Sequence, residues 1–363
     1  MAILNTQDIN EVLSGVIDPF HGLDLVSSKQ VDAIEIVDES VKIELKFGYP
    51  SATAAQQVQD LVNATLIARF PNNQFELSSS TELLSHSVQK NLTPLPNVKN
   101  IIAVASGKGG VGKSTTSVNL ALSLAAEGAQ VGVLDADIYG PSIPRMLGAD
   151  DKPESEDGKT VKPLVNHGIQ FISIGLLISE ETPMVWRGPM VTQALEQLLR
   201  QTQWRDLDYL IIDLPPGTGD IQLTLAQKIP VSGSIIVTTP QDISLLDALK
   251  GLKMFEKVDV PVLGVVENMS THICSSCGHE EHIFGSGGGE QLAADNNIEL
   301  LGALPLDINI REHADSGKPT VVADPDGKIA SVYRDIALKA AAKLAIRSQD
   351  FSHHFPNIVI KND

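Results

Sequence analysis

The sequence predicts an α/β protein in two parts: a small α+β domain, then a large doubly wound domain with a mostly parallel sheet. Near the N-terminus, two short runs that alternate apolar and polar residues indicate half-buried strands. After residue 100 the pattern changes to continuous apolar runs separated by helix-length segments, which is typical of a parallel sheet covered on both faces. A length of 363 residues suits two domains.

The N-terminal part predicts two helices and a hairpin. A polar helix is expected at residues 6–13, and the alternating runs at residues 31–37 and 41–47 predict a β-hairpin with one solvent-facing side. A second helix is expected at residues 53–68, because apolar residues recur there at helical spacing. A polar segment marked by prolines follows and predicts a linker.

The remaining chain predicts the large domain. Its expected strands are at residues 101–105, 131–134, 169–174, 209–212, 234–238, 262–266 and 300–303. A last helix is expected at residues 328–347; it either closes the core or lies on a membrane, and its alanine-rich apolar face favours the core. We therefore expect these boundaries: a small domain at 1–86, a linker at 87–99, a large domain at 100–350 and a tail at 351–363.

Charge and hydropathy limit the binding partners and the cellular location that we expect. Acidic residues outnumber basic ones by 45 to 27, a net charge of −18, and no basic cluster offsets it. Such a surface repels nucleic acid and anionic lipid. The N-terminus lacks the basic and apolar regions of a signal peptide, and no apolar run reaches the ~20 residues of a membrane helix. We expect a cytoplasmic protein that binds neither nucleic acid nor membrane.

A glycine-rich loop joins the first strand of the large domain to a helix expected at residues 116–126. It fits the phosphate-binding pattern G-x-x-x-x-G-K-S/T in the strand–loop–helix context that this pattern requires, which predicts ATP as the ligand. Lys113 is expected to bind the β- and γ-phosphates, and Ser114 to bind Mg²⁺. The expected nucleotide-binding loop comprises Gly107, Lys108, Gly109, Gly110, Val111, Gly112, Lys113, Ser114 and Thr115.

Three aspartates stand at the ends of predicted strands. Asp135 and Asp137 follow the second strand of the large domain, and Asp213 ends an apolar run in the Walker B pattern. Ligands of open parallel sheets bind at the carboxyl ends of the strands. We therefore expect all three near the phosphates, with Asp213 holding Mg²⁺.

A second lysine in the loop, Lys108, resembles the deviant Walker A loop of the MinD, ParA and nitrogenase-iron-protein class. This resemblance implies a nucleotide-sandwich homodimer in which Lys108 reaches the partner's nucleotide and stabilises charge during hydrolysis. It also implies that Asp137 positions the attacking water and that Asp135 lies near the metal. By the same resemblance, Asn268 reads the adenine and Asp307 lies along the base and ribose.

Longer phrases resemble the Mrp/ApbC family of iron–sulfur cluster carriers over about residues 98–345. They occupy residues 135–144, 186–189, 213–220, 274–280, 283–288 and 305–311. The resemblance implies an ATPase that carries a labile [4Fe–4S] cluster from the cluster assembly machinery to apo-proteins. The first domain resembles the small MIP18-like module of bacterial members, with Asp18 and Pro19 in the expected place. It lacks the cysteine that often follows the second strand there, which argues against a cluster ligand in this domain.

The chain has two cysteines, Cys274 and Cys277, and two thiolates cannot fill a four-coordinate metal site. A [4Fe–4S] cluster can bridge two chains, zinc can bind with His279 and His282, or the pair can be a redox dithiol. The family resemblance and the dimer implied by Lys108 favour the bridging cluster. The rival functions are a ParA/MinD-type spatial organiser, a nitrogenase-type reductase and an ATPase with a structural zinc.

Overall fold

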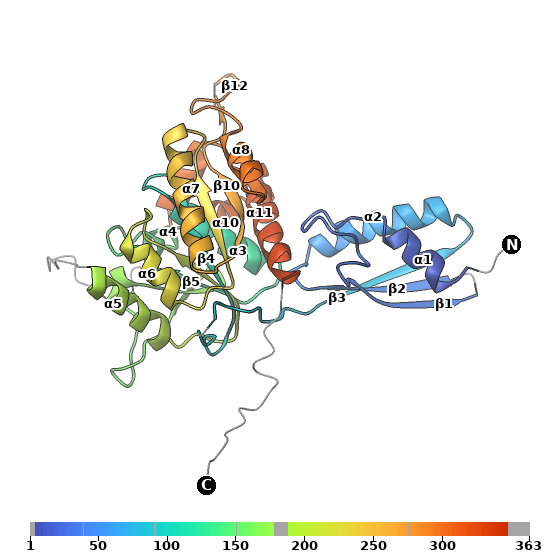
Figure 1. Ribbon diagram of the computed structural model, residues 1–363, viewed down its shortest axis with the longest axis horizontal. Coiled ribbons are helices and arrows are strands. Elements are labelled where there is room, and N and C mark those ends of the chain that lie inside the picture. The colour runs from blue at the N-terminus through green and yellow to red at the C-terminus, as the bar shows by residue number, and fades with distance from the viewer. Residues whose placement is uncertain are drawn as a thin grey trace, which may run out of the picture.

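The computed structural model describes residues 4–38, 40–90, 92–149, 151–177, 188–274 and 276–347. They form a small N-terminal domain beside a larger one (Figure 1). The small domain consists of α1 (Thr6–Leu13), β1 (Val31–Val37), β2 (Ser40–Phe47), α2 (Ala54–Arg69) and β3 (Gln74–Thr81). The expected tail at 351–363 lies outside the described residues.

The small domain is a three-stranded sheet with two helices. The strand order is β1-β2-β3, with β1 and β2 antiparallel and β2 and β3 parallel. Alternate residues of β2 are buried, among them Ile43, Leu45 and Phe47, which confirms the predicted hairpin with one wet face. The sequence did not predict β3, because it ends in serines and a threonine and leaves only Phe75 and Leu77 half-buried.

The large domain is an eight-stranded sheet with helices on both faces (Figure 1). Its order is β13-β10-β9-β4-β8-β5-β7-β6, parallel except for β6 against β7. The strands are β4 (Val98–Ala105), β5 (Val131–Asp135), β6 (Leu164–Asn166), β7 (Ile169–Ser173), β8 (Leu207–Asp213), β9 (Gly233–Thr238), β10 (Val262–Glu267) and β13 (Leu300–Ala303). The seven predicted strands are present, and β6 is an antiparallel edge addition.

Two apolar cores lie on opposite faces of this sheet. In β4, Ile102 and Val104 join the core beneath α3 (Lys113–Ala126) and α11 (Lys328–Ala345). Ala103 and Ala105 join the other core, beneath α5 (Gly188–Gln201), α6 (Asp220–Lys228) and α7 (Asp242–Lys257). Burial on both faces explains the continuous apolar strand sequences. The last helix belongs to the core, as expected, and no helix in the described ranges is long and apolar enough to cross a membrane.

The remaining helices are short and lie mostly around the carboxyl ends of the strands. They are α4 (Ile143–Met146), the 3₁₀ helix η1 (Ile174–Leu176), α8 (Gly288–Asp295), α9 (Ile308–Asp315) and α10 (Thr320–Ala323). A two-stranded ribbon, β11 (His272–Ile273) with β12 (Glu280–Glu281), projects from the large domain (Figure 1).

The segment expected as a linker is held on the large domain. Gln89 is buried; its side-chain nitrogen donates to the carbonyls of Ala226 and Ile229 at 2.8 and 3.1 Å, and its oxygen accepts from the Val231 amide. Residues 98 and 99 already belong to β4. The free connection between the domains is therefore shorter than the proline content suggested.

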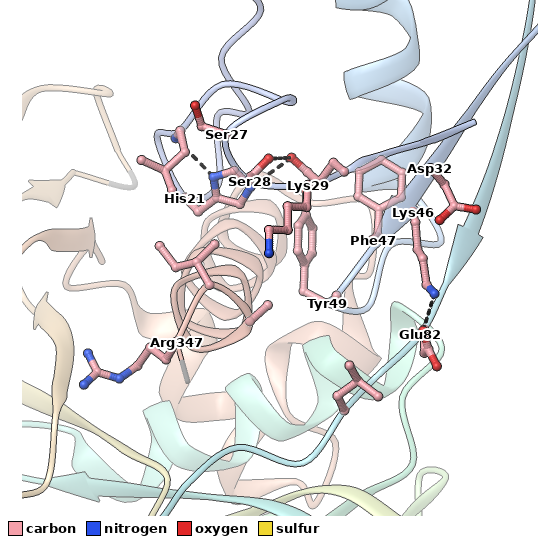
Figure 2. Close-up of a pocket in the computed structure, with 16 residues that line it drawn as sticks. His21, Ser27, Ser28, Lys29, Asp32, Lys46, Phe47, Tyr49, Glu82 and Arg347 are labelled. Carbon is pink, nitrogen blue, oxygen red and sulfur yellow. Dashed lines mark hydrogen bonds and ion pairs between the residues drawn. The ribbon is translucent and has the colours of Figure 1, made fainter. Parts of the chain in front are cut away.

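Asp18 of the small domain has a structural role. Its carboxylate is fully buried and accepts hydrogen bonds from Tyr49 Oη at 2.5 Å, Gln30 Nε2 at 2.7 Å and the Phe20 amide at 2.8 Å. These donors satisfy the charge away from water. The network forms one wall of a cleft of about 540 Å³ between the small domain and the end of α11, where Arg347 lies opposite (Figure 2).

Glu127, at the end of α3, joins the two domains. Its buried carboxylate accepts from the Thr53 amide at 2.8 Å and from Thr53 Oγ1 at 2.5 Å, and lies 3.6 Å from Arg334 Nε. A carboxylate is unfavourable at a helix C-terminus but favourable at the N-terminus of α2, where Thr53 is the N-cap. The acid therefore stabilises the junction rather than its own helix.

We expect Glu127→Ala to loosen this junction. Hydrogen bonds to a charged group contribute about 1.5–3 kcal/mol each, so exchange of the Thr53 amide should accelerate roughly tenfold to a hundredfold. Hydrogen exchange read by mass spectrometry on peptides covering residues 48–60 measures this. Glu299→Ala, which removes only the partner of Lys343, is the control. Unchanged exchange at Thr53 would contradict the role of Glu127.

Candidate functional site

The phosphate loop lies between β4 and α3, and its glycines are required by space and backbone. Gly112 has φ +82°, and a Cβ there would lie 2.1 Å from Asn268 Nδ2. A Cβ on Gly107 would lie 2.2 Å from the backbone of Asp247 in α7. Larger residues would displace the loop, so the glycines hold its amides at the helix N-terminus, where anions bind.

Lys113 and Asp213 meet at the centre of the site. Lys113 Nζ lies 2.7 Å from Asp213 Oδ2 and 3.8 Å from Asp137 Oδ2, and only 6% of the lysine is exposed. Ser114 Oγ donates to Asp213 Oδ2 at 2.5 Å, and Ser117 Oγ donates to Asp213 Oδ1 at 2.7 Å. The structure thus brings together the predicted lysine, serine and Walker B aspartate.

Asp135 lies beside Asp213, since the two residues are paired across β5 and β8. It is fully buried and accepts from the Asp137 amide, the Ile143 amide and Ser173 Oγ at 3.1, 3.3 and 3.0 Å. Burial, and then the neighbouring Asp213 charge, raise the pKa of Asp135 to about 7. Burial also raises the pKa of Asp137, and Lys113 opposes that rise.

The charge of this cluster favours a divalent cation. Asp213 and Asp137 lie within 4 Å of the Lys113 ammonium group, and Asp135 lies beside Asp213, so acidic side chains outnumber cations here even before phosphates enter. Within the described ranges no group of three or more His, Cys, Asp or Glu side chains can hold a metal by itself. A Mg²⁺ ion at this site would therefore need phosphate oxygens and water as ligands in addition to Ser114 and Asp213.

Lys108 carries an uncommitted cation beside the site. It is half-buried, and its carbonyl accepts from Ser106 Oγ at 2.9 Å. Its ammonium group forms no ion pair with any residue in the part of the chain that the structure describes. A lysine so placed is free to meet a group from outside the chain.

The two residues expected at the base have defined positions. Asn268 is buried after β10, and its Nδ2 donates to the Val111 carbonyl in the phosphate loop at 2.9 Å. Asp307 is the N-cap of α9, where its Oδ1 accepts from the Asn309 amide at 2.7 Å. Asn268 therefore touches the loop directly, whereas Asp307 caps a helix at the same edge of the sheet.

Cys274 and Cys277 lie in the turn of the β11–β12 ribbon, which we call the cysteine hairpin (residues 272–282). The Cys274 amide donates to the His279 carbonyl at 2.9 Å, and the Gly278 amide to the Cys274 carbonyl at 2.8 Å. Cys277 is exposed and Cys274 is half-buried. Hydrogen bonds from the backbone amides of Cys277 and Ser276 lower the pKa of the Cys274 thiol, which favours the thiolate that metals bind.

Sequence reasoning missed two polar contacts to the aspartates, those of Ser117 and Ser173. Ser117 lies one helical turn after Ser114, so spacing along α3 places both hydroxyls toward Asp213. Ser173 ends β7, next to β5, and no motif marks it. Of the phrase at 186–189, residues 186 and 187 lie outside the described residues.

A phosphate loop after the central strand of a mostly parallel sheet, with a Walker B aspartate on the adjacent strand, defines a P-loop NTPase. The profile described as NUBPL iron-transfer P-loop NTPase matches residues 97–341, and the chain belongs to this family. A second profile, iron-sulfur cluster assembly protein, matches residues 6–72.

Known proteins agree with this assignment. The iron-sulfur cluster carrier protein of Escherichia coli is 52% identical over 321 residues, covering 88% of this chain and 87% of that protein. The iron-sulfur cluster transfer protein NUBPL of Mus musculus is 50% identical over 266 residues, covering 73% and 83%. A nucleotide-binding protein of Archaeoglobus fulgidus, solved with ADP, is 36% identical with a TM-score of 0.56, covering 64% of this chain and 90% of that one. The resemblance to cluster carriers is confirmed.

Proposed function

We propose that this protein is an ATP-hydrolysing carrier that receives a labile [4Fe–4S] cluster from the assembly machinery and transfers it to cytoplasmic apo-proteins. The observation that carries this is one domain that holds both a phosphate site and a pair of cysteines on a projecting hairpin, of which Cys277 is exposed and the pKa of the Cys274 thiol is lowered by backbone hydrogen bonds. The names of its relatives support cluster transfer. They favour it over a spatial-organising ATPase.

The nucleotide site works through a change of partners at Lys113. In the structure, this lysine pairs with Asp213. With ATP bound, Lys113 would turn to the β- and γ-phosphates, and Ser114 and Asp213 would hold Mg²⁺, with Asp135 beside Asp213. When bound, the ion offsets charge on the phosphates. The exchange keeps the buried lysine paired throughout.

Hydrolysis requires the dimer. Lys108 has no ion-pair partner among the described residues and is half-buried next to the loop. We place it across the interface, on the nucleotide of the partner subunit, where it stabilises charge on the transferred phosphoryl group. Asp137, 3.8 Å from Lys113, holds the attacking water.

The cluster is cargo shared by two chains. Each chain offers Cys274 and Cys277, so four thiolates come from a dimer. A zinc site within one chain has less support. The described residues contain no group of three or more His, Cys, Asp or Glu side chains placed to hold a metal. Two ligands per chain suit a cluster that must leave.

The function is tested by anaerobic reconstitution of the full-length protein followed by transfer to an apo-enzyme, with and without ATP. We expect iron and sulfide to be bound and the recipient to gain activity. Stoichiometric zinc with no iron uptake would contradict the carrier function and leave the nucleotide site standing.

Asp137→Asn is expected to separate ATP binding from hydrolysis. The amide keeps the shape but loses the negative charge beside the attacking water, and general-base contributions are typically about 10²–10⁴-fold. We expect near-normal ATP affinity and turnover lowered by about 100-fold or more, measured by nucleotide titration and phosphate release. Weak binding with unchanged turnover per bound nucleotide would make Asp137 a structural residue.

A further inference from the structure

Two histidines fasten the cysteine hairpin to the large domain. His272 Nδ1 lies 3.1 Å from the Leu306 carbonyl oxygen, and His282 Nδ1 lies 2.9 Å from the Ser270 carbonyl oxygen. A carbonyl only accepts, so each Nδ1 carries a hydrogen and donates it. These two side-chain bonds hold the hairpin to the large domain in addition to the backbone bridge between His272 and Leu306.

The carbonyls that receive these bonds belong to the segments expected to bind the nucleotide base. Ser270 comes two residues after Asn268, and Leu306 immediately precedes Asp307. The two segments are tied together, since the Ser270 amide donates to the Leu304 carbonyl at 2.9 Å and the Leu306 amide to the Thr271 carbonyl at 2.7 Å. Movement of either segment moves the anchors of the hairpin.

Asn268 extends this connection to the phosphate loop. Its Nδ2 donates to the Val111 carbonyl at 2.9 Å, and its Oδ1 accepts from the Met269 amide at 2.9 Å. If Asn268 turns to an adenine, it must release Val111. The Val111 carbonyl and an adenine are thus alternative partners of the Asn268 side chain.

The backbone next to Asn268 is poised to respond. Met269 has φ +59°, a left-handed conformation that is unfavourable for a residue other than glycine. It lies between Asn268 and Ser270, so its strain can be released when Asn268 changes partner. After β12 the chain continues through Gly285 and Gly287, which both have positive φ. Glycines restrain the backbone little, so this side of the hairpin can follow such a movement.

We propose that His272 and His282 are positioning residues that transmit nucleotide binding from Asn268 to Cys274 and Cys277. This inference rests on the ATP site of the proposed function and adds the route by which that site reaches the cysteines. Binding of ATP moves the Ser270 and Leu306 carbonyls, the two histidines follow, and the thiols change their exposure. Neither histidine has to touch the cluster.

The test uses the full-length, reduced, cluster-free protein and needs no cargo. The rate of alkylation of Cys274 and Cys277 by iodoacetamide is measured by mass spectrometry with and without Mg-ATP. Coupling between sites is typically about 5–150-fold, so we expect ATP to change the wild-type rate by about fivefold or more. His272→Ala and His282→Ala should reduce this change to less than about twofold.

Matched variants separate the hydrogen bond from the histidine itself. Asparagine places an amide nitrogen where Nδ1 lies, so His272→Asn and His282→Asn should retain most of the ATP response. His279→Ala alters an exposed histidine of the same hairpin whose side chain forms no hydrogen bond with a described residue, and it should behave as wild type. ATP titration of each variant shows that the nucleotide site is filled.

The proposal is overturned if the alanine variants respond to ATP as the wild type does. It is also overturned if the asparagine variants fail as the alanine variants do while binding ATP normally, or if the wild-type thiols do not respond. Cluster transfer in the wild type without a thiol response would leave the carrier function standing and remove only this coupling. A thiol response without cluster uptake would keep the coupling and contradict the carrier.

Discussion

Lys113→Ala is expected to abolish productive ATP binding. The lysine is the buried cation of the site and is proposed to bind both the β- and γ-phosphates. Hydrogen bonds to charged groups contribute about 1.5–3 kcal/mol each, so affinity should fall roughly 100-fold or more. Nucleotide titration of the purified protein measures this. Lys113→Gln, which keeps a donor for Asp213, controls for loss of folding caused by an unpaired buried carboxylate.

Lys108→Ala is the informative comparison with Lys113. It should keep most of the ATP affinity, because its own loop still binds the phosphates. Turnover should fall by about 10³–10⁵-fold if Lys108 acts as an arginine finger does in other NTPases. Phosphate release at saturating ATP, measured above and below the concentration at which the protein dimerises, gives the result. Normal hydrolysis by Lys108→Ala would show that the sandwich dimer is wrong.

Cys274→Ser and Cys277→Ser are each expected to remove cluster binding and spare ATP hydrolysis. The cysteine hairpin is formed by β11 and β12, whereas the residues proposed to contact phosphate and Mg²⁺ come from α3, β5 and β8. The wild type should saturate near four iron atoms per dimer, since a [4Fe–4S] cluster takes four thiolates. Iron, sulfide and zinc analysis after anaerobic reconstitution, with the visible charge-transfer band, measures the loss.

A mixed dimer separates a shared cluster from a site within one chain. One wild-type chain paired with one Cys274→Ser, Cys277→Ser chain offers two thiolates, and it should hold no stable cluster. A single-chain zinc site would keep half of its metal in the same sample. A full cluster on an isolated wild-type monomer would contradict the bridging arrangement.

The sequence anticipated the elements that are buried on both faces. β8 and β9 are buried throughout, and each contains an unbroken apolar run, as a strand covered on both faces requires. It did not anticipate β3, whose polar residues carry no such signal, because that strand is defined by pairing with β2 rather than by its own composition. The docking of Gln89 on the large domain was not predicted either, because the polar, proline-marked segment around it has the composition of a linker.

The candidate site also has one part that the sequence predicts and another that only the fold shows. The phosphate loop is local: its glycines, lysine and serine act within nine consecutive residues, so their order in the chain already specifies the geometry. The family resemblance supplied the expected role of the cysteine pair and the identity of its cargo. Neither the local sequence of the loop nor the family resemblance could predict that Ser173 contacts Asp135, or that Ser117 and Ser114 contact the two carboxylate oxygens of Asp213.

By itself, then, the sequence determined a doubly wound P-loop domain, its nucleotide loop and a cysteine pair too small to complete a metal site. Only the tertiary structure decided which distant groups meet. Ser114 and Asp213 are separated by 99 positions and touch because β4 and β8 are neighbours in the sheet. His282 reaches Ser270, and Asn268 reaches Val111, through folded loops. Such contacts depend on strand order and register, which local patterns of hydrophobicity do not encode.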